Sequence, residues 1–304
     1  MLAHPFVRTW AAAASGSGRD LGGFAGLAAA AALRAGVTAE LMVPVRDGVV
    51  VLPSLGAIEA GPGVPAVRLR IADGTVAGDP AWRRARELGA LRLDDVDPYR
   101  DCFTLPVAPR LTGEEAEAWT ARLGAALRWI TERVPQYRPG LETVLRVVVP
   151  LRPGPGSGLR SAAARTAFGA VAVGLAPDAP SLATLLVHEV QHLKLGAVLD
   201  VCHLFDQADP RRIMVPWRDD PRPVEAALHG CYAFAAVAEV WRHQRESEAG
   251  ERSARYRGWV VAVIGQLLTG GGLTPAGCGS SSACGGPWTA GDPVTVRLGP
   301  RSVG

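Results

Sequence analysis

The residues with the clearest chemical potential lie in the segment 181–200, SLATLLVHEVQHLKLGAVLD. His188 and His192 are four positions apart in it, and Glu189 lies between them. On an α-helix, side chains four residues apart lie one above the other on the same face. Two imidazoles so placed can bind one metal ion, with Glu189 beside it as an acid or base. The alternative interpretation is a pair of hydrogen-bonded core histidines.

The rest of this segment predicts a buried helix. Ser181, which follows Pro180, is the expected N-cap. Apolar side chains occupy nearly every side of the helix, namely Leu182, Leu185, Leu186, Val187, Val190, Leu193 and Leu195. An unpaired polar group buried in such a place costs on the order of 1–3 kcal/mol. The polar side chains of the motif therefore need partners, and a metal ion would supply one.

A metal ion bound by two histidines needs at least one further protein ligand. The helix predicted after Pro223 carries Glu225 and His229, which are four residues apart, and Tyr232 three residues further on. We expect His229 to be the third ligand, with Glu225 as a substitute or as a group that orients the ligand. The ordinary interpretations are a core or surface histidine, and an acid favoured by the helix dipole.

Composition places few limits on the partners of the chain. The 304 residues are 48% hydrophobic, and 32 basic and 29 acidic residues give a formal net charge of +3. No Lys/Arg run suggests nucleic acid. The five cysteines form no CxxC pair, which favours a reducing compartment. We see neither a signal peptide nor a membrane span and expect a soluble cytoplasmic protein with no membrane partner.

The first third of the chain predicts a helix and two hairpins. The helix is expected over residues 20–35 and ends at Gly36. Each hairpin is expected to turn at an Asp-Gly pair between apolar runs, at Asp47-Gly48 and at Asp73-Gly74. Together these elements predict an antiparallel sheet.

The middle of the chain predicts one long helix and two strands. A capping box formed by Thr112 and Glu115 begins the helix, which runs to about residue 134. Strands are expected at 141–151 and at 166–175. We expect the second strand to form a sheet edge above the metal helix, because an open edge can pair with an extended peptide.

The remaining chain predicts helices and a tail. One helix follows Pro223 and reaches about residue 244, and another covers roughly 252–269. The Gly/Ser/Pro-rich segment 271–304 is expected to be poorly ordered. The sequence thus predicts an α+β fold in one domain over residues 1–270, with an antiparallel sheet, a metal helix packed under an edge strand, and a helical C-terminal part.

Several longer segments together resemble a known family. They are HPFVRTW, AAAALRAGVTAELMVPVRDG, DPYRDC, SAAARTAFGAV, LLVHEVQHLKLGAVLD and PWRDDPRP. The set is similar to the HExxH domain of ribosomal-peptide maturation systems. That domain occurs fused to or beside radical-SAM maturases that crosslink peptides into cyclophanes, including those with FxSxx-COOH precursors. The resemblance covers about residues 4–243 and includes no Cys-rich radical-SAM half.

The resemblance implies a peptide-tailoring metalloenzyme. Members of the family are seen as Fe(II)- and 2-oxoglutarate-dependent enzymes that hydroxylate a side-chain β-carbon of a precursor peptide. It implies as partners a ribosomal precursor peptide and a separate radical-SAM maturase of the same pathway. His188, His192 and His229 would bind the iron. An arginine would bind the far carboxylate of 2-oxoglutarate, and the candidates are Arg165, Arg218 and Arg222.

Two other functions remain open on the residues alone. In a zinc peptidase the same ligands hold Zn²⁺, Glu189 activates the bound water, and Tyr232 stabilises the oxyanion. In a hydroxylase Glu189 is instead a base or a group that orients a histidine. The third hypothesis is a non-catalytic peptide-binding module with a metal. Imidazole ligands suit both zinc and iron, so they do not separate these hypotheses.

Overall fold

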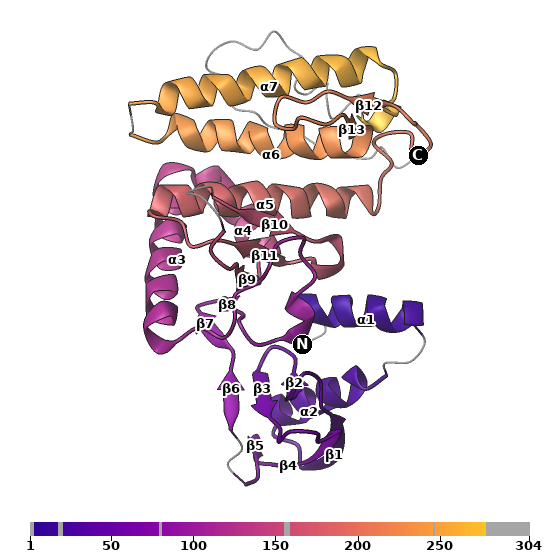
Figure 1. Ribbon diagram of the computed structural model, residues 1–304. Coiled ribbons are helices and arrows are strands. Elements are labelled where there is room, and N and C mark those ends of the chain that lie inside the picture. Colours follow the sequence, from indigo (N-terminus) through magenta and orange to yellow (C-terminus); the bar gives the residue numbers. More distant parts are fainter. Residues whose placement is uncertain (1–2, 18–20, 79–80, 155–158, 246, 278–304) are drawn as a thin grey trace. The chain divides into compact units, whose positions relative to one another are not determined.

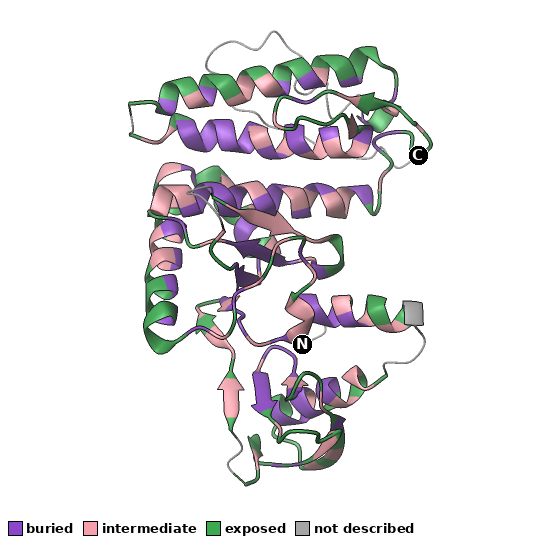
Figure 2. Ribbon diagram, viewed as in Figure 1, coloured by how far each residue is buried: buried purple, intermediate pink, exposed green. Residues whose placement is uncertain are grey.

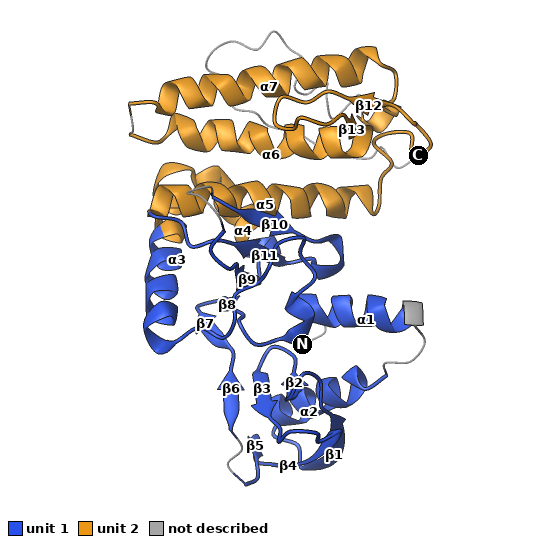
Figure 3. Ribbon diagram, in the orientation of Figure 1, with its two compact units in different colours: residues 1–125, 142–177 blue, residues 126–141, 178–304 orange. Residues whose placement is uncertain are grey.

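The computed structural model describes residues 3–17, 21–78, 81–154, 159–245 and 247–277 (Figure 1). The chain divides into two compact units (Figure 3). Unit 1 is Met1–Ala125 with Glu142–Pro177, and unit 2 is Ala126–Leu141 with Asp178–Gly304. The mixed α+β class is as predicted: small sheets lie in the N-terminal half and helices dominate the C-terminal part. The prediction of one domain over residues 1–270 stays a prediction.

Unit 1 begins with two helices, α1 (Pro5–Ser17) and α2 (Gly23–Ala35). The sequence analysis missed α1, although its Phe6, Val7 and Trp10 form a buried apolar face. The prediction of α2 is confirmed, and Gly36 ends it in the left-handed region with φ of 65°.

Two three-stranded sheets follow these helices. Their orders are β1-β4-β5 and β2-β3-β6, with the bounds β1 (Ala39–Pro44), β2 (Val49–Leu52), β3 (Gly56–Glu59), β4 (Ala66–Ala72), β5 (Thr75–Val76) and β6 (Trp82–Arg84). The hairpin that turns at Asp73-Gly74 is confirmed, since it joins β4 to β5. The predicted hairpin at Asp47-Gly48 is wrong in its partners, because β1 pairs with β4 and β2 with β3. Only the bridge between Arg46 and Val49 closes that turn.

The largest sheet is mixed rather than antiparallel. Its order is β10-β11-β9-β8-β7, with the bounds β7 (Arg86–Leu88), β8 (Leu91–Leu93), β9 (Val147–Pro150), β10 (Ser161–Ala163) and β11 (Ala170–Val173). β9 runs parallel to both β8 and β11. The prediction that the strand before the motif helix is an edge is wrong, because β11 pairs on both sides and β10 is the edge. All four residues of β11 are buried, as in a central strand.

The segment between β8 and α3 (Gly113–Arg133) is held by a buried carboxylate. Asp95, whose side chain is fully buried, accepts hydrogen bonds from Arg86 Nε at 3.2 Å, from Arg110 Nη1, and from the Leu111 amide at 3.0 Å. The short 3-10 helix η1 (Pro98–Arg100) lies in the same segment. The predicted capping box then begins α3: the Glu115 amide donates to Thr112 Oγ1 at 3.2 Å, and the Thr112 amide donates to Glu115 Oε2 at 2.8 Å.

Unit 2 contains the end of α3, the short 3-10 helix η2, the first part of the short helix α4, and three long helices. The elements are η2 (Pro135–Tyr137), α4 (Arg138–Val144), α5 (Ala179–Leu199), α6 (Val224–Arg242) and α7 (Ala249–Thr269). α4 begins in unit 2 and ends in unit 1, and it occupies part of the predicted strand 141–151. The small hairpin of β12 (Arg212–Ile213) and β13 (Arg222–Pro223) precedes α6. α6 packs against both α5 and α7, as Figure 1 shows.

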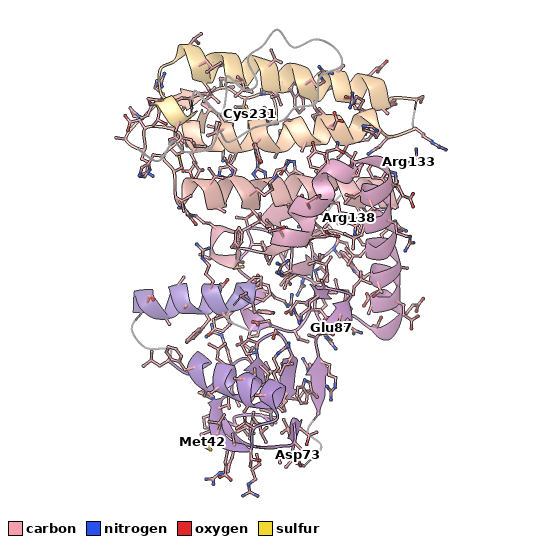
Figure 4. All side chains as sticks on the ribbon, turned by 180° about the vertical axis from the view of Figure 1, so that it is seen from behind. Met42, Asp73, Glu87, Arg133, Arg138 and Cys231 are labelled. Atoms are coloured by element: carbon pink, nitrogen blue, oxygen red, sulfur yellow. The ribbon has the colours of Figure 1, made fainter. Side chains whose placement is uncertain are left out.

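The core of unit 2 lies between these helices. Leu199, Val224, Ala227 and Val263 are among its buried members (Figure 2), and Cys231, labelled in Figure 4, is 3% exposed on α6. None of the described helices is long and apolar enough to cross a membrane.

The first residues of the predicted tail are packed on the core. Leu273 forms a bridge with Phe205, and the Thr274 amide donates to Leu204 O at 3.1 Å. The rest of the predicted tail, residues 278–304, lies outside the described residues.

Removal of the Asp95 carboxylate should destabilise the protein strongly. Asp95→Ala leaves two guanidinium groups and the Leu111 amide without their buried acceptor, so we expect a loss of at least about 2 kcal/mol in the free energy of unfolding. Glu40→Ala is the matched control, since Glu40 also pairs with two arginines but is about half exposed. It should cost about 1 kcal/mol or less. Urea unfolding measures both, and equal losses would contradict the prediction.

Candidate metal centre

Three histidines predicted as ligands meet where α5 packs against α6. His188 and His192 lie one turn apart on α5, and His229 lies on α6. His188 Nε2 is 3.1 Å from His192 Nε2, and His192 Nδ1 is 3.3 Å from His229 Nδ1. All three side chains are partly buried. The structure therefore brings together residues that are 37 positions apart in the chain.

The local sequence explains how α5 presents these rings. The Asp178 side chain caps the helix by accepting from the Ser181 amide at 2.7 Å, so the prediction of Ser181 as the N-cap is wrong. Pro180 then occupies the first turn, where its missing amide costs nothing. Nearly every other side of α5 is buried and apolar, including Leu186 and Val187, which leaves the histidine face as its polar side.

A pocket of about 470 Å³ opens at the histidines. All the residues that line it belong to unit 2, and they are His188, His192, Trp217, Arg218, Arg222, Pro223, Glu225, Ala226, His229, Gly230 and Phe234. Both candidates for the third ligand, His229 and Glu225, thus reach the pocket. His229 is the one whose ring nitrogen approaches His192.

Aromatic rings form one wall of this pocket. The Phe234 ring meets the His188 imidazole edge-on, with centroids 5.2 Å apart. The Trp217 ring centroid lies 5.0 Å from that of Phe234. Sequence analysis missed these two residues and Gly230, because they carry no metal-ligand chemistry. The position of Phe234, five residues after His229 on the same helix, was the available signal.

The three arginine candidates have different surroundings. Arg218 and Arg222 line the pocket. Arg222 Nη1 donates to Asp220 Oδ2 at 3.0 Å. The exposed Arg218 side chain makes no hydrogen bond or ion pair within the described residues, although the pKa of Asp220 is lowered by the hydrogen bond from Arg222 and, to a lesser extent, by the charge of Arg218. Arg165 is an exposed residue of η3 (Arg165–Ala167) in unit 1. The structure therefore brings two of the three candidates to the histidines.

Glu189 and Tyr232 do not line the pocket in the described part of the chain. The Glu189 side chain is 4% exposed, and its Oε1 lies 3.9 Å from His188 Nε2. The Tyr232 ring instead faces Lys194, whose Nζ is 5.6 Å from the ring centroid. Glu189 is thus placed to act on the His188 ring, and Tyr232 contacts a different part of α5.

Burial keeps the histidines of α5 uncharged. Desolvation lowers the pKa of His188 from 6.5 to about 4. Desolvation, followed by the neighbouring His188 and His229, lowers the pKa of His192 well below its usual value. Both rings are therefore neutral at pH 7, which is the form in which imidazole binds a metal ion.

The donor set fits a metal ion in chemistry, and two pairs of its nitrogens have a suitable spacing. Two nitrogens bound at about 2.0–2.1 Å to one tetrahedral ion lie about 3.3 Å apart, close to the two separations here. His192 directs its two nitrogens to different neighbours, however, and among the described residues no group of three side chains is arranged to hold an ion. One ring must turn for all three to bind the same ion.

The third ligand can be identified by metal content. His229→Ala should lose most of the bound iron or zinc, because it removes the imidazole nitrogen that lies 3.3 Å from His192 Nδ1, whereas Glu225→Ala should retain it. Metal per protein after anaerobic purification measures both. A His229→Ala protein with full metal content beside a metal-free Glu225→Ala protein would reverse the assignment.

The lowered pKa values predict a loss of stability in acid. The unfolded chain binds protons on these histidines near pH 6.5. In the folded chain the pKa of His188 is about 4, and that of His192 also lies well below 6.5. The free energy of unfolding of metal-free protein should therefore fall as the pH falls from about 6.5 towards 4. His188→Gln with His192→Gln should weaken that dependence, and His203→Gln, at an exposed position, should not. Urea unfolding at several pH values gives the comparison.

Neither a family model nor a curated protein matches this chain.

Proposed function

We propose that the protein is an Fe(II)- and 2-oxoglutarate-dependent hydroxylase of a ribosomally made precursor peptide. The observation that carries this proposal is the set of three neighbouring imidazoles at a pocket that is also lined by the exposed Arg218. The resemblance to the HExxH domain of peptide maturation systems supports the same class of reaction. Its expected target is a side-chain β-carbon.

His188, His192 and His229 are the residues that would hold the iron. Imidazole nitrogens are donors that Fe(II) accepts, and three protein ligands would leave open positions for small ligands. Iron with 2-oxoglutarate and O₂ supplies the oxidising power to add one oxygen atom to carbon, with release of CO₂ and succinate. Because burial keeps His188 and His192 unprotonated, no proton has to be removed from them before they bind.

Arg218 is the residue that we assign to the far carboxylate of 2-oxoglutarate. A guanidinium can donate two parallel hydrogen bonds to a carboxylate. Arg222 is already paired with Asp220, so a carboxylate would have to compete with that partner. Trp217 and Phe234 contribute the apolar wall that keeps water away from the histidines.

Glu189 is assigned a positioning role. Its carboxylate is buried beside His188 and does not line the pocket, so it is placed to orient the imidazole rather than to reach a bound water. The substrate peptide is expected to arrive already crosslinked by a separate radical-SAM enzyme, as the resemblance implies. It cannot add as a strand to β11, which is paired on both sides.

A zinc peptidase is the second candidate. The observation in its favour is Glu189 itself, one residue after His188 with a 3.9 Å approach between carboxylate and ring. A general base must reach the water it activates, within about 3 Å or through one further water. Glu189 is not among the described residues that line the pocket, so the zinc peptidase is the weaker candidate.

Hydroxylation should be directly visible by mass. With Fe(II), 2-oxoglutarate, O₂ and a crosslinked precursor peptide, the product should gain one oxygen atom, and one succinate should form per turnover. Arg218→Ala should raise the 2-oxoglutarate concentration needed for half-maximal rate by about tenfold or more, because a bidentate charge-assisted contact is lost. Arg165→Ala is the matched control from unit 1 and should leave it unchanged.

The same assay separates the candidates. Peptide fragments that form with Zn²⁺ and without 2-oxoglutarate, and that disappear in Glu189→Gln, would establish the peptidase. Partial hydroxylation by Glu189→Gln would agree with a positioning role. Tight peptide binding with no product under either condition would leave only the non-catalytic peptide-binding module.

A further inference from the structure

The loop between β12 and β13 carries Trp217 to the histidine pocket. The loop is anchored below Trp217 by Val215, which is 2% exposed in the core of unit 2, and it turns where the Arg218 amide donates to Val215 O at 3.2 Å. The two ends of the loop are joined because β12 pairs with β13, with Ile213 opposite Arg222. Trp217 is therefore held from both sides of the loop.

Gly230 provides the surface on which the indole rests. A Cβ atom at this position would lie 2.2 Å from Trp217 Cζ2 and 2.5 Å from Cε2. Carbon atoms do not approach so closely, so the indole lies directly on the α6 backbone and requires glycine there. Gly230 follows His229, and the Phe234 ring lies one turn further along the helix. The indole is thus placed beside the residues that present imidazoles to the pocket.

We propose that Trp217, seated on Gly230, is a specificity-determining residue of the histidine pocket. Its indole sets how large a group can reach His188, His192 and His229. The inference rests on the proposed function only in taking these histidines as the reactive end of the pocket. It makes no use of the identity of the metal.

Substitutions at two positions, Trp217 and Gly230, test the contact between the indole and the α6 backbone. Trp217→Ala removes the ring and should expose the histidines, and Trp217→Phe should have a smaller effect in the same direction. Gly230→Ala adds the Cβ that displaces the indole. Its effect should appear only while Trp217 is present, so it should vanish in the double variant Gly230→Ala, Trp217→Ala.

Diethyl pyrocarbonate is the probe of exposure. The full-length metal-free protein is treated for increasing times, and modification of each histidine is followed by peptide mass spectrometry, with exposed His203 as the internal reference. Trp217→Ala should increase the rates at the three pocket histidines by about threefold or more, since side chains that line a pocket set access to it. Gly230→Ala should change them by about twofold or more in the wild-type background alone.

The chain offers matched controls for both changes. Trp10→Ala removes an indole of unit 1 that also lies on a glycine, since a Cβ atom at Gly23 would be 2.2 Å from Trp10 Cε2, and Trp10 does not line the pocket. Gly258→Ala adds a methyl group to α7 with no neighbour within 4 Å. Neither should alter the rates. Unchanged rates in Trp217→Ala and Trp217→Phe, or an equal effect of Gly230→Ala with and without Trp217, would overturn the proposal.

A second measurement tests size selection itself. In protein loaded with Co(II), the ratio of affinities for 4-phenylimidazole and imidazole should rise by about threefold or more in Trp217→Ala, because the larger probe gains more from the removed ring. An unchanged ratio would contradict size selection. A protein that shows the exposure changes but never hydroxylates a peptide would refute the proposed function while leaving the role of Trp217 intact.

Discussion

The burial of two uncharged imidazoles on α5, His188 and His192, beside His229 of α6 is the constraint on which unit 2 depends. α5 is apolar on nearly all its other sides, so its polar face must be matched by what α6 presents. His229 meets His192, and Phe234 meets His188, so imidazole and benzene rings complete the contact. Burial would be costly for imidazolium, but it is tolerable for His188 and His192 because these two rings remain neutral, and a neutral ring keeps a nitrogen lone pair available.

Helices were predicted from the sequence where their signals are local. The capping box of Thr112 and Glu115 and the glycine that ends α2 were located correctly, because each acts through neighbours within one turn. The N-cap of α5 was misplaced for a reason of the same kind. Proline is favoured inside the first turn, so Pro180 implies a cap before it, and Asp178 supplies that cap.

Local sequence signals could not predict which strands pair or which residues form the walls of the histidine pocket. Asp-Gly at 47–48 does turn the chain, yet β1 finds its partner in β4 across residues 45–65. Pairing over that distance is decided by which faces bury together, which turn residues do not encode. Spacing located the three histidines, but Trp217 and Gly230 belong to the site only because a loop folds back onto α6.

The division of the chain into two units also affects the order in which the parts of each unit are synthesised. Residues 126–141 belong to unit 2, but the chain leaves that unit for residues 142–177 before it returns at 178. Synthesis proceeds from the N-terminus, so the C-terminal half of α3 emerges before any of the long helices of its own unit. Neither unit can be excised as one continuous segment, because each is built from two separate stretches of the chain. A nascent chain stopped at residue 177 holds a finished unit 1 with a fragment of unit 2 still attached.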